Sequence, residues 1–351
     1  MRILITPLDW GLGHATRCIP VIEELLNRGC DVSIATSGGA LSLLKKEFPR
    51  LTYYEIVSYN VQYQTSGSFI RKLIGQASKF LRAIASEHKQ AEKIVVENSI
   101  DLIISDNRYG CWSDKVKSIF ITHQLNLLPQ SGRLISAIVN WFIISRIKKF
   151  DECWIPDLPN SFYSGTLSKN SSVPRRYIGI LSRFKSATPS ESKYKVLAIV
   201  SGPEPQRQIF EDIIRNQCSK VDGKVLMVKG RPEKENTFQV DGNLTEVNHL
   251  CKSELQEAIL SSEFVMVRSG YSSIMDLASL NKKNIIMVPT PGQPEQEYLA
   301  KRLSQKNLIY SSSQNSLHLL ESMQRAEMTQ GFSTSNSANL LTEALTSVNV
   351  K

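Results

Sequence analysis

The chain has 351 residues, more than one average hydrophobic core serves, and its length predicts roughly two domains. Its 41% hydrophobic and 21% charged residues exclude global disorder, and its net charge of +9 favours an anionic partner. The six cysteines are scattered and include no C-x-x-C pair. We therefore expect reduced thiols, with neither a metal site nor a disulfide framework.

No stretch of about 18 uninterrupted apolar residues occurs, so no membrane-spanning segment is expected. The first apolar run, Arg2–Thr6, is too short for a signal peptide and predicts a buried strand. The chain also has no recognisable nucleic-acid module. We expect a cytoplasmic protein, at most peripheral on the inner face of the cytoplasmic membrane, with no nucleic-acid partner.

The N-terminal half alternates predicted strands and helices, which is the pattern of a doubly wound α/β domain. Its strands are near-continuous apolar runs, typical of a parallel sheet covered on both faces. The strands are predicted at Arg2–Thr6, Asp31–Thr36, Asp101–Ser105, Ser118–Thr122 and Glu152–Pro156. The helices are predicted at Ala15–Arg28, Phe69–Glu92 and Leu134–Lys148.

A polar stretch at Ser182–Lys193 reads as a linker, after which a second α/β alternation begins. Its strands are predicted at Tyr194–Val200, Lys224–Lys229, Phe264–Val267 and Asn284–Pro289, and its helices at Pro205–Gln217, Ser253–Ser261 and Ser272–Ser279. The tail Ser311–Ser337 carries no clear pattern, and a last helix is expected near Ser337–Ser347. The predicted domains are thus 1–181 and 194–336, joined by linker 182–193 and followed by helix 337–351. Two such domains predict a cleft between the carboxyl ends of their sheets.

The loop after the first strand, DWGLGHATR, opens the first predicted helix. Gly11 and Gly13 allow a tight turn, and the start of a helix offers N–H groups to an anion. The pattern is neither G-x-G-x-x-G nor a Walker loop. His14 could take a proton from an acceptor hydroxyl. The alternative is a capping histidine in a purely structural turn.

Two more polar positions follow predicted strands of this half. Asp106 could orient His14, hold an acceptor hydroxyl, or only cap the following turn. His123 and Gln124 follow the run SIFIT and suit acceptor contacts, with a structural role as the alternative.

A strand, a Ser-Gly pair and a helix meet again in the second half, in the run VRSGYSSIMD. Arg268, Ser269 and Gly270 would form an anion cradle from helix N–H groups. Asp276 lies six residues past the glycine, where a carboxylate suits a ribose diol; an ordinary helix acid is the alternative. The loop TPGQPEQE then presents Glu295 and Gln296, whose side chains suit sugar hydroxyls.

In these motifs the chain resembles glycosyltransferase family 28, the MurG-like group, most specifically over Phe264–Ala300. The resemblance implies the GT-B fold, in which two Rossmann-like α/β domains face each other across a cleft. It also implies a nucleotide-sugar donor, commonly UDP-linked, inversion at the anomeric carbon, and no bound metal or cofactor. The chain contains no D-x-D motif, in agreement with that expectation.

Matched positions carry family roles onto this sequence. Gly13 and His14 match the Gly-His of the family's first glycine loop, and Ser269 and Gly270 its phosphate-approaching Ser-Gly. On the donor side, Asp276 matches a glutamate that binds the ribose in the family, and Gln296 matches a glutamine that binds the donor sugar. Gly179 and Arg183 match a Gly-x-x-x-Arg motif whose arginine lies beside the diphosphate. Ser201 and Gly202 lie where the family has a second glycine-rich loop.

The departures from the family pattern separate this chain from MurG itself. The first loop lacks the family's run of glycines, Arg17 stands where MurG-type chains have proline, and Pro203 interrupts the second loop. Asp276 is one methylene shorter than the family's glutamate. These differences indicate another bacterial branch and leave the nucleotide base and the acceptor open.

The sequence therefore predicts an inverting, metal-independent transferase that moves a hexose or N-acetylhexosamine to a cell-envelope or lipid-linked acceptor. Its predicted catalytic residues are His14 and Asp106. Its predicted donor-binding residues are Arg183, Ser201, Gly202, Arg268, Ser269, Gly270, Asp276, Glu295 and Gln296. Its predicted acceptor-side residues are Gly11, Gly13, Arg17, His123 and Gln124.

Two other functions fit the same motifs. A nucleotide-sugar 2-epimerase would release product without an acceptor, and a non-catalytic nucleotide-sugar-binding protein would tolerate loss of His14. The predicted helices Phe69–Glu92 and Leu134–Lys148 mix apolar and basic residues and could lie on an anionic membrane surface. They could equally be amphipathic helices packed on the sheet.

Overall fold

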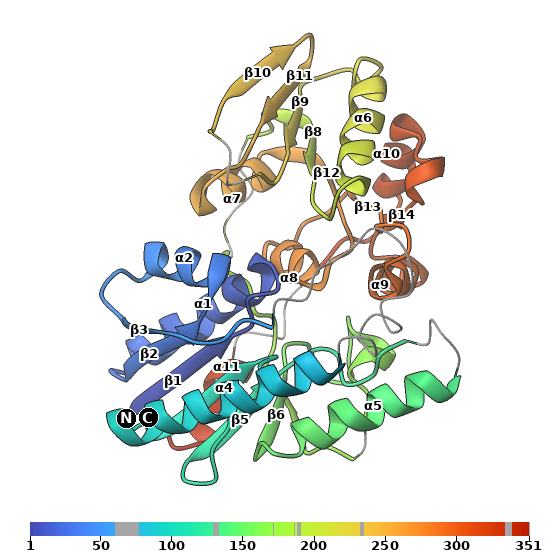
Figure 1. Cartoon of the computed structure of the whole chain (residues 1–351). Coiled ribbons are helices and arrows are strands. Elements are labelled where there is room, and N and C mark those ends of the chain that lie inside the picture. The colour runs from blue at the N-terminus through green and yellow to red at the C-terminus, as the bar shows by residue number, and fades with distance from the viewer. Residues whose placement is uncertain are drawn as a thin grey trace. The chain divides into compact units, whose positions relative to one another are not determined.

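A computed structural model describes residues 1–59, 77–128, 133–170, 172–185, 187, 191–231, 235–333 and 339–350. The chain folds as two compact units, Met1–Arg183 with Ser335–Lys351 (unit 1) and Phe184–Thr334 (unit 2). Each unit is a β-sheet with helices on both faces (Figure 1).

Unit 1 contains a sheet of seven described strands in the order β3-β2-β1-β4-β5-β6-β7, with every pair parallel. The strands are β1 (Arg2–Pro7), β2 (Asp31–Thr36), β3 (Thr52–Glu55), β4 (Leu102–Asp106), β5 (Lys117–Ile121), β6 (Glu152–Ile155) and β7 (Arg175–Tyr177). The order reverses between β1 and β4, because the chain adds β2 and β3 on one side of β1 and β4 on the other. Such a reversal is where α/β proteins place ligands.

Alternating residues of β1 serve two different cores. Ile3 and Ile5 pack with α1 (Leu12–Asn27), α2 (Gly38–Glu47) and α11 (Leu340–Ser347). Leu4 packs on the opposite face with α4 (Ala77–Asn98). The same face continues under α5 (Arg133–Ile147), and a 3₁₀ turn lies at Gly165–Leu167.

Helix α11 follows unit 2 in the chain but belongs to unit 1. Its Ala344 and Leu345 are fully buried in the core beneath α1. Arg28, just after α1, donates hydrogen bonds to the hydroxyl of Thr346 (3.2 Å) and to the carbonyl of Thr342 (3.1 Å). Gly29, with φ of +71°, then takes the left-handed conformation that ends a helix.

Unit 2 repeats the plan in a sheet of seven described strands, ordered β10-β11-β9-β8-β12-β13-β14. The strands are β8 (Tyr194–Ile199), β9 (Val225–Val228), β10 (Phe238–Asp241), β11 (Leu244–Val247), β12 (Ser262–Val267), β13 (Ile285–Met287) and β14 (Tyr310–Ser311). The order reverses between β8 and β12. The edge strand β10 pairs antiparallel with β11, and all other pairs are parallel.

The helices of unit 2 cover both faces of its sheet. Helices α6 (Gln206–Cys218) and α10 (Leu319–Glu327) pack on the face of Val196 and Ala198. The remaining helical segments are α7 (Lys252–Leu260), α8 (Tyr271–Ser279), α9 (Pro294–Gln305) and a 3₁₀ turn at Gln314–Ser316. Among the described residues, no helix is long and apolar enough to cross a membrane.

The predicted doubly wound α/β architecture is confirmed, and so are the strands and helices predicted around both order reversals. The elements without a predicted range are β3, β7, α2, the β10–β11 hairpin, α9, β14 and α10. Glu295 and Gln296, predicted to lie in the loop before a helix, instead lie in the first turn of α9. The stretch Ser311–Ser337, which carries no clear sequence pattern, contains α10. Of the helix predicted at Phe69–Glu92, residues 69–76 lie outside the described part of the chain.

Candidate active site

The two order reversals bring together residues far apart in sequence. In unit 1, the loop with His14 follows β1, and Asp106 is the last residue of the neighbouring strand β4. In unit 2, Ser201 and Gly202 follow β8, and Arg268 follows the neighbouring strand β12. The predicted motifs therefore lie at the carboxyl ends of adjacent strands in each sheet.

His14 and Asp106 form a hydrogen-bonded pair. His14 lies in the first turn of α1 with 18% of its side chain exposed, and its Nδ1 is 2.8 Å from Oδ1 of the fully buried Asp106. A carboxylate only accepts hydrogen bonds, so Nδ1 carries the hydrogen and Nε2 keeps its lone pair. Within the described part of the chain, Nε2 makes no hydrogen bond. That nitrogen is suited to accept a proton.

Arg17 lies one helical turn after His14, contacts both members of this pair, and is 3% exposed. Its Nε and Nη2 donate to the two oxygens of Asp106, and its Nη1 is 3.0 Å from Nδ1 of His123. His123 is 7% exposed and lies two residues past β5. The four side chains thus form one contiguous cluster, the unit 1 cluster.

Charge within the unit 1 cluster shifts two pKa values. Burial alone would raise the pKa of Asp106, but the guanidinium of Arg17 and the imidazole of His14 outweigh it and hold that pKa well below its ordinary value. Burial lowers the pKa of His14; Asp106 opposes this, while Arg17 and His123 add to it. The net result keeps His14 neutral and Asp106 ionised at neutral pH.

A second buried ion pair, absent from the sequence predictions, lies beside the strand ends that carry this cluster. Arg108 and Glu87 are fully buried, and Arg108 Nη1 donates to Glu87 Oε1 at 2.9 Å. Arg108 Nε also donates to the carbonyl of Pro7, the last residue of β1 (2.9 Å). Tyr59 and the backbone N–H of Gly110 donate to the other oxygen of Glu87. The network joins the ends of β1 and β4 to helix α4.

The signal for this pair is Glu87 itself. It lies among the apolar positions Phe80, Ile84 and Ala91 of α4, on the face that packs against the sheet. A carboxylate on a buried helix face needs a cationic partner, because burying an unpaired charge is costly. Arg108, directly after a buried strand, was the available partner.

The other predicted acceptor-side residues lie around the same helix start and strand end. Gly11 is the exposed N-cap of α1, with φ of +79°, and Gly13 is half-buried and accepts a hydrogen bond from Thr16 (3.1 Å). Gln124 is half-buried next to His123, and its N–H donates to the hydroxyl of Thr122 (3.1 Å).

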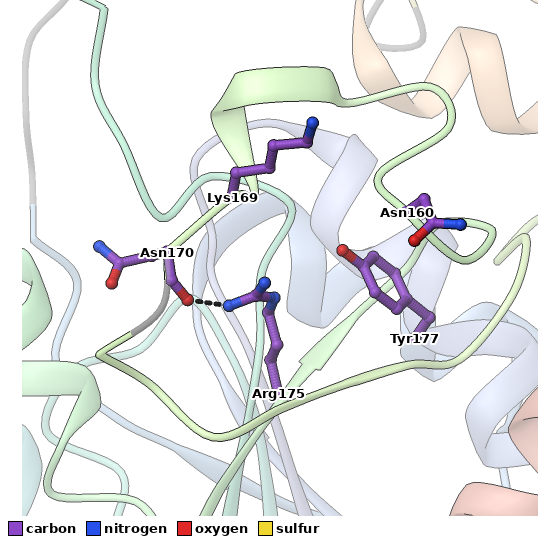
Figure 2. A pocket seen from close by; sticks show the side chains of 5 residues that line it. All are labelled: Asn160, Lys169, Asn170, Arg175 and Tyr177. Carbon is purple, nitrogen blue, oxygen red and sulfur yellow. Dashed lines mark hydrogen bonds between the residues drawn. The ribbon is translucent and has the colours of Figure 1, made fainter.

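A separate pocket of about 340 Å³ lies beside the edge strand β7 of unit 1 (Figure 2). Arg175 in this pocket donates to the carbonyl of Asn170 (Figure 2). The hydroxyl of Tyr177 is 2.8 Å from that of Ser161. None of the predicted site residues lines it; the lining residues are Asn160, Lys169, Asn170, Arg175 and Tyr177.

Arg268 in unit 2 is a buried cation whose hydrogen-bond partners are neutral carbonyl and amide oxygens. Its Nη2 donates to the carbonyl of Gln206 (2.9 Å) and to the side-chain oxygen of Gln314 (2.6 Å). Its Nη1 donates to the carbonyls of Val288 and Pro289, and its Nε to that of Ser201. Burial lowers the pKa of Arg268 to about 10. All five N–H donors are engaged, so Arg268 holds neighbouring loops rather than being available to a ligand directly.

Gly202 adopts a φ of +106°, which favours glycine, in the loop after β8. An added Cβ would lie 3.4 Å from the hydroxyl oxygen of Thr290. That hydroxyl is fully buried and has no hydrogen-bond partner in the described part of the chain. Buried polar atoms without protein partners call for an explanation, and a role in contacting a ligand at this loop is one.

The remaining donor-side predictions divide between loop support and helix starts. Gly270 is the N-cap of α8 without a side-chain cap. Ser269 donates its hydroxyl to the carbonyl of Gln296 (2.8 Å), and the side-chain oxygen of Gln296 accepts from the N–H of Thr290 (2.8 Å). Asp276 and Glu295 are half-buried on α8 and α9. These contacts tie the two helix starts together.

Arg183 is the last residue of the first segment of unit 1, whereas the other predicted donor-binding residues belong to unit 2. It is half-buried. Its assignment to the donor diphosphate remains a prediction.

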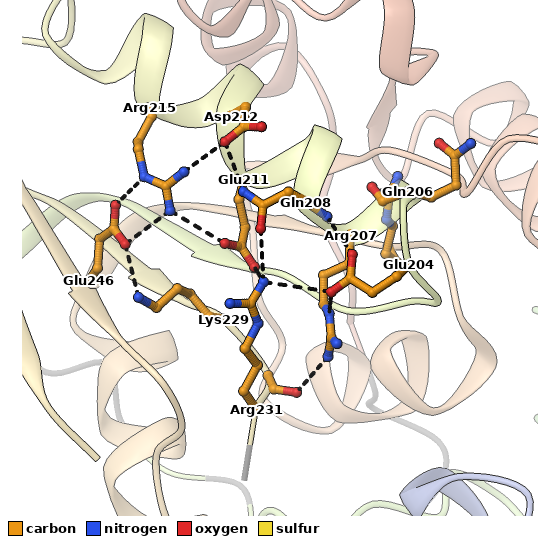
Figure 3. Close-up of polar contacts among 12 residues, drawn as sticks. Glu204, Gln206, Arg207, Gln208, Glu211, Asp212, Arg215, Lys229, Arg231 and Glu246 are labelled. Carbon is orange, nitrogen blue, oxygen red and sulfur yellow. Dashed lines mark hydrogen bonds and ion pairs between the residues drawn. The ribbon is translucent and has the colours of Figure 1, made fainter. Parts of the chain in front are cut away.

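A network of charged side chains, also absent from the sequence predictions, begins just after the Gly202 loop (Figure 3). Its centre is Glu211 of α6, 1% exposed, which accepts from Arg231 (2.7 Å) and Arg215 (3.3 Å). Arg215 and Lys229 in turn contact Glu246 of β11. Acidic and basic groups alternate, so the charges pair with one another. We therefore interpret the network as a structural contact that holds α6 against the ends of β9 and β11.

The unit 1 cluster makes a stability prediction. Arg17→Met leaves Asp106 as a buried, uncompensated carboxylate and should lower the free energy of unfolding by about 3–5 kcal/mol. The double variant Arg17→Met/Asp106→Asn removes both charges, so its free energy of unfolding should fall clearly less than that of the single variant. All four tryptophans lie in unit 1, so urea unfolding followed by tryptophan fluorescence reports on this unit. A double variant no more stable than the single variant would contradict the prediction.

Comparison with known proteins identifies the second half of the chain. Residues 206–347 match the glycosyltransferase family 28 C-terminal domain. An uncharacterized glycosyltransferase of Methanosarcina acetivorans is 24% identical over 326 residues, covering 85% of this chain and 82% of that protein. A UDP-N-acetylglucosamine--N-acetylmuramyl-(pentapeptide) pyrophosphoryl-undecaprenol N-acetylglucosamine transferase of Sulfurihydrogenibium sp. is 23% identical over 290 residues, covering 80% of this chain and 75% of that protein.

Solved structures match the whole chain. The glycotransferase of kitacinnamycin aligns with a TM-score of 0.65 at 14% identity, covering 99% of this chain and 94% of that one. MurG of Acinetobacter baumannii aligns with a TM-score of 0.57 at 12% identity, covering 100% and 99%. The glycosyltransferase VinC, solved in complex with dTDP, aligns with a TM-score of 0.59 at 12% identity, covering 98% and 92%. The chain is therefore a glycosyltransferase of the GT-B fold that carries the C-terminal domain of glycosyltransferase family 28.

Proposed function

We propose that the protein is an inverting, metal-independent transferase that moves a hexose or N-acetylhexosamine from a nucleotide-sugar to a cell-envelope or lipid-linked acceptor. The observation that carries this proposal is the His14–Asp106 pair, whose imidazole keeps an unengaged Nε2 at the carboxyl end of β1. In a chain with a family 28 C-terminal domain, a base on the first unit fits deprotonation of the acceptor.

Unit 2 supplies the donor side of the proposal. The uncapped start of α8 after Gly270 offers backbone N–H groups to the diphosphate, and the helix dipole favours negative charge there. The buried guanidinium of Arg268 donates to the carbonyl of Ser201, and its hydrogen-bond partners within the described part of the chain include no carboxylate. Fixed donors and a buried cation can stabilise charge that grows on the leaving diphosphate, which a metal ion does in other transferases.

The base step follows from the unit 1 cluster. Nε2 of His14 takes the proton of the acceptor hydroxyl, and the resulting imidazolium is stabilised by its Nδ1–H hydrogen bond to Asp106. The hydroxyl oxygen then attacks the anomeric carbon from the side opposite the diphosphate, and inverts it. The bond between the anomeric carbon and the diphosphate oxygen breaks, and its electron pair leaves with the nucleoside diphosphate.

The base assignment predicts the pH dependence of the reaction. The pKa of His14 lies below the ordinary value of 6.5, so His14 is neutral and active above that pKa and is lost as a base when it protonates below it. The acid limb of kcat/KM should therefore fall with an apparent pKa below 6.5. His14→Gln should lower kcat/KM about 100- to 10,000-fold.

Release of nucleoside diphosphate from UDP-N-acetylglucosamine, with a lipid-linked monosaccharide as acceptor, is the assay. His318→Gln is the matched control, because His318 is exposed at the start of α10 in unit 2. An unchanged rate in His14→Gln would remove His14 as the base. Product formed without acceptor would indicate an epimerase, and donor binding without turnover would indicate a non-catalytic nucleotide-sugar-binding protein.

The donor assignment rests on the family relation and on relatives. The Sulfurihydrogenibium relative is named for a UDP-N-acetylglucosamine donor, and VinC was solved with dTDP. We expect UDP-sugars to bind most tightly in a calorimetric panel of UDP-, GDP- and dTDP-sugars measured in chelator. Asp276→Ala should abolish that binding, whereas Glu327→Ala on α10 should not. Tight binding of GDP- or dTDP-sugars alone would change the assignment of the nucleotide base. No binding of any nucleotide-sugar would contradict the proposed donor site.

A lipid-linked acceptor implies contact with a membrane surface, and α5 has a surface suited to it. Ile138 and Trp141 are 58% and 72% exposed and lie one helical turn apart. Lys148 and Lys149, just past the helix, are also exposed. Exposed apolar side chains beside basic residues are typical of interfacial helices. Phe142 instead packs inward, with its ring 6.4 Å from that of Phe80.

The protein should sediment with vesicles that contain anionic phospholipid at low salt and much less with neutral vesicles. Ile138→Ser/Trp141→Ser should reduce that binding, because it removes the apolar side chains that would enter the interface. Val96→Ser, at another exposed apolar position (59% exposed, on α4), is the control. Full recovery of wild-type protein in the supernatant would remove the membrane-surface proposal.

A further inference from the structure

A single guanidinium contacts both imidazoles of the unit 1 cluster. Arg17 Nη1 is 3.0 Å from Nδ1 of His123, and Arg17 Nη2 is 3.0 Å from Nδ1 of His14. Nε and Nη2 of the same side chain also donate to both oxygens of Asp106. The hydrogen that each Nδ1 does or does not carry is therefore set by what faces it.

The facing group decides the state of His123. A guanidinium stays protonated at all physiological pH values and can only donate hydrogen bonds. The Nδ1 of His123 must then accept, so it carries no hydrogen. A neutral imidazole that accepts at Nδ1 has its hydrogen on Nε2. This His123 tautomer offers an N–H and has no lone pair at Nε2 to receive a proton.

His14 faces two groups, and the carboxylate outweighs the guanidinium. Oδ1 of Asp106 is 2.8 Å from Nδ1 and stays ionised, so a lone pair on Nδ1 would face an anion. Arg17 Nη2 already donates to that same oxygen and does not need His14 as an acceptor. The hydrogen of His14 is consequently on Nδ1, and its lone pair is on Nε2.

We propose that Arg17 is a positioning residue that holds the two histidines in opposite tautomers, with His14 as the only base of the pair and His123 as an N–H donor. This assignment builds on the proposed transferase site but is a statement about protonation that needs no turnover. It also gives a role to the residue that departs from the proline of MurG-type chains.

The charge of Arg17 has a second effect on His14. The groups that face His14 are Arg17 of its own helix, Asp106 at the end of β4 and His123 after β5. Cys18, which faces Asp106 at 3.7 Å, stays a neutral thiol because burial raises its pKa. Of the facing groups only Asp106 favours protonation of His14. Loss of the Arg17 charge should thus raise the pKa of His14.

Histidine NMR on the full-length protein tests the tautomers. The chain has five histidines, so a sample labelled with ¹⁵N at histidine and assigned with His14→Gln and His123→Gln is tractable. For the neutral imidazoles, two-bond ¹H–¹⁵N spectra should show the hydrogen on Nδ1 of His14 and on Nε2 of His123. The same tautomer at both residues, or a hydrogen on Nδ1 of His123, would overturn the proposal.

Two substitutions of Arg17 separate charge from geometry. Arg17→Gln should move the NMR titration of His14 to higher pH, whereas Arg17→Lys keeps the charge and should leave that titration near the wild-type position. An unmoved titration in Arg17→Gln would overturn the charge effect. Tryptophan fluorescence checks that each variant is folded. If a variant does not fold, the histidine tautomers of the wild-type protein still test the main proposal. The transferase proposal is tested separately, by nucleoside diphosphate release.

Discussion

The buried carboxylate of Asp106 is the group on which the architecture of unit 1 depends most. It has no exposed surface, ends a central strand, and is surrounded by donors from Arg17 and His14. Such a charge is tolerated only when its hydrogen bonds and its counter-charge are both supplied. The position of α1 against β4 is consequently tied to the hydrogen bonds that Arg17 and His14 make with this carboxylate.

The two units handle a buried charge at the same topological position in different ways. In unit 1 an anion at the order reversal has a cation beside it. In unit 2 a cation, Arg268, is surrounded by neutral oxygens and by the ring of Phe210, with the guanidinium carbon 4.2 Å from the ring centre. A paired anion suits proton transfer, whereas a buried cation without a carboxylate partner can stabilise negative charge on a nearby ligand through space, without a direct hydrogen bond. The division of labour proposed between acceptor and donor follows from this difference.

Sequence reasoning located the central strands and the loops after them, because buried parallel strands are long apolar runs that end in glycine or polar residues. It failed at the sheet edges. Strand β10 is exposed along its whole length and β3 is exposed at both ends, so neither shows an apolar run. His14 and Asp106 were placed by their strands, but Arg17 bridging them depends on a side-chain direction that no local pattern encodes. The Arg108–Glu87 pair likewise requires a contact across 21 residues.

The return of α11 to unit 1 makes that unit discontinuous in sequence. Unit 2 is an insertion between the body of unit 1 and the helix that completes its core under α1. During synthesis, unit 2 is finished before α11 emerges, whereas domains without such an insertion can close as soon as they leave the ribosome. The sheet that carries His14 and Asp106 would therefore wait, with part of its apolar surface uncovered, until the second unit has been made.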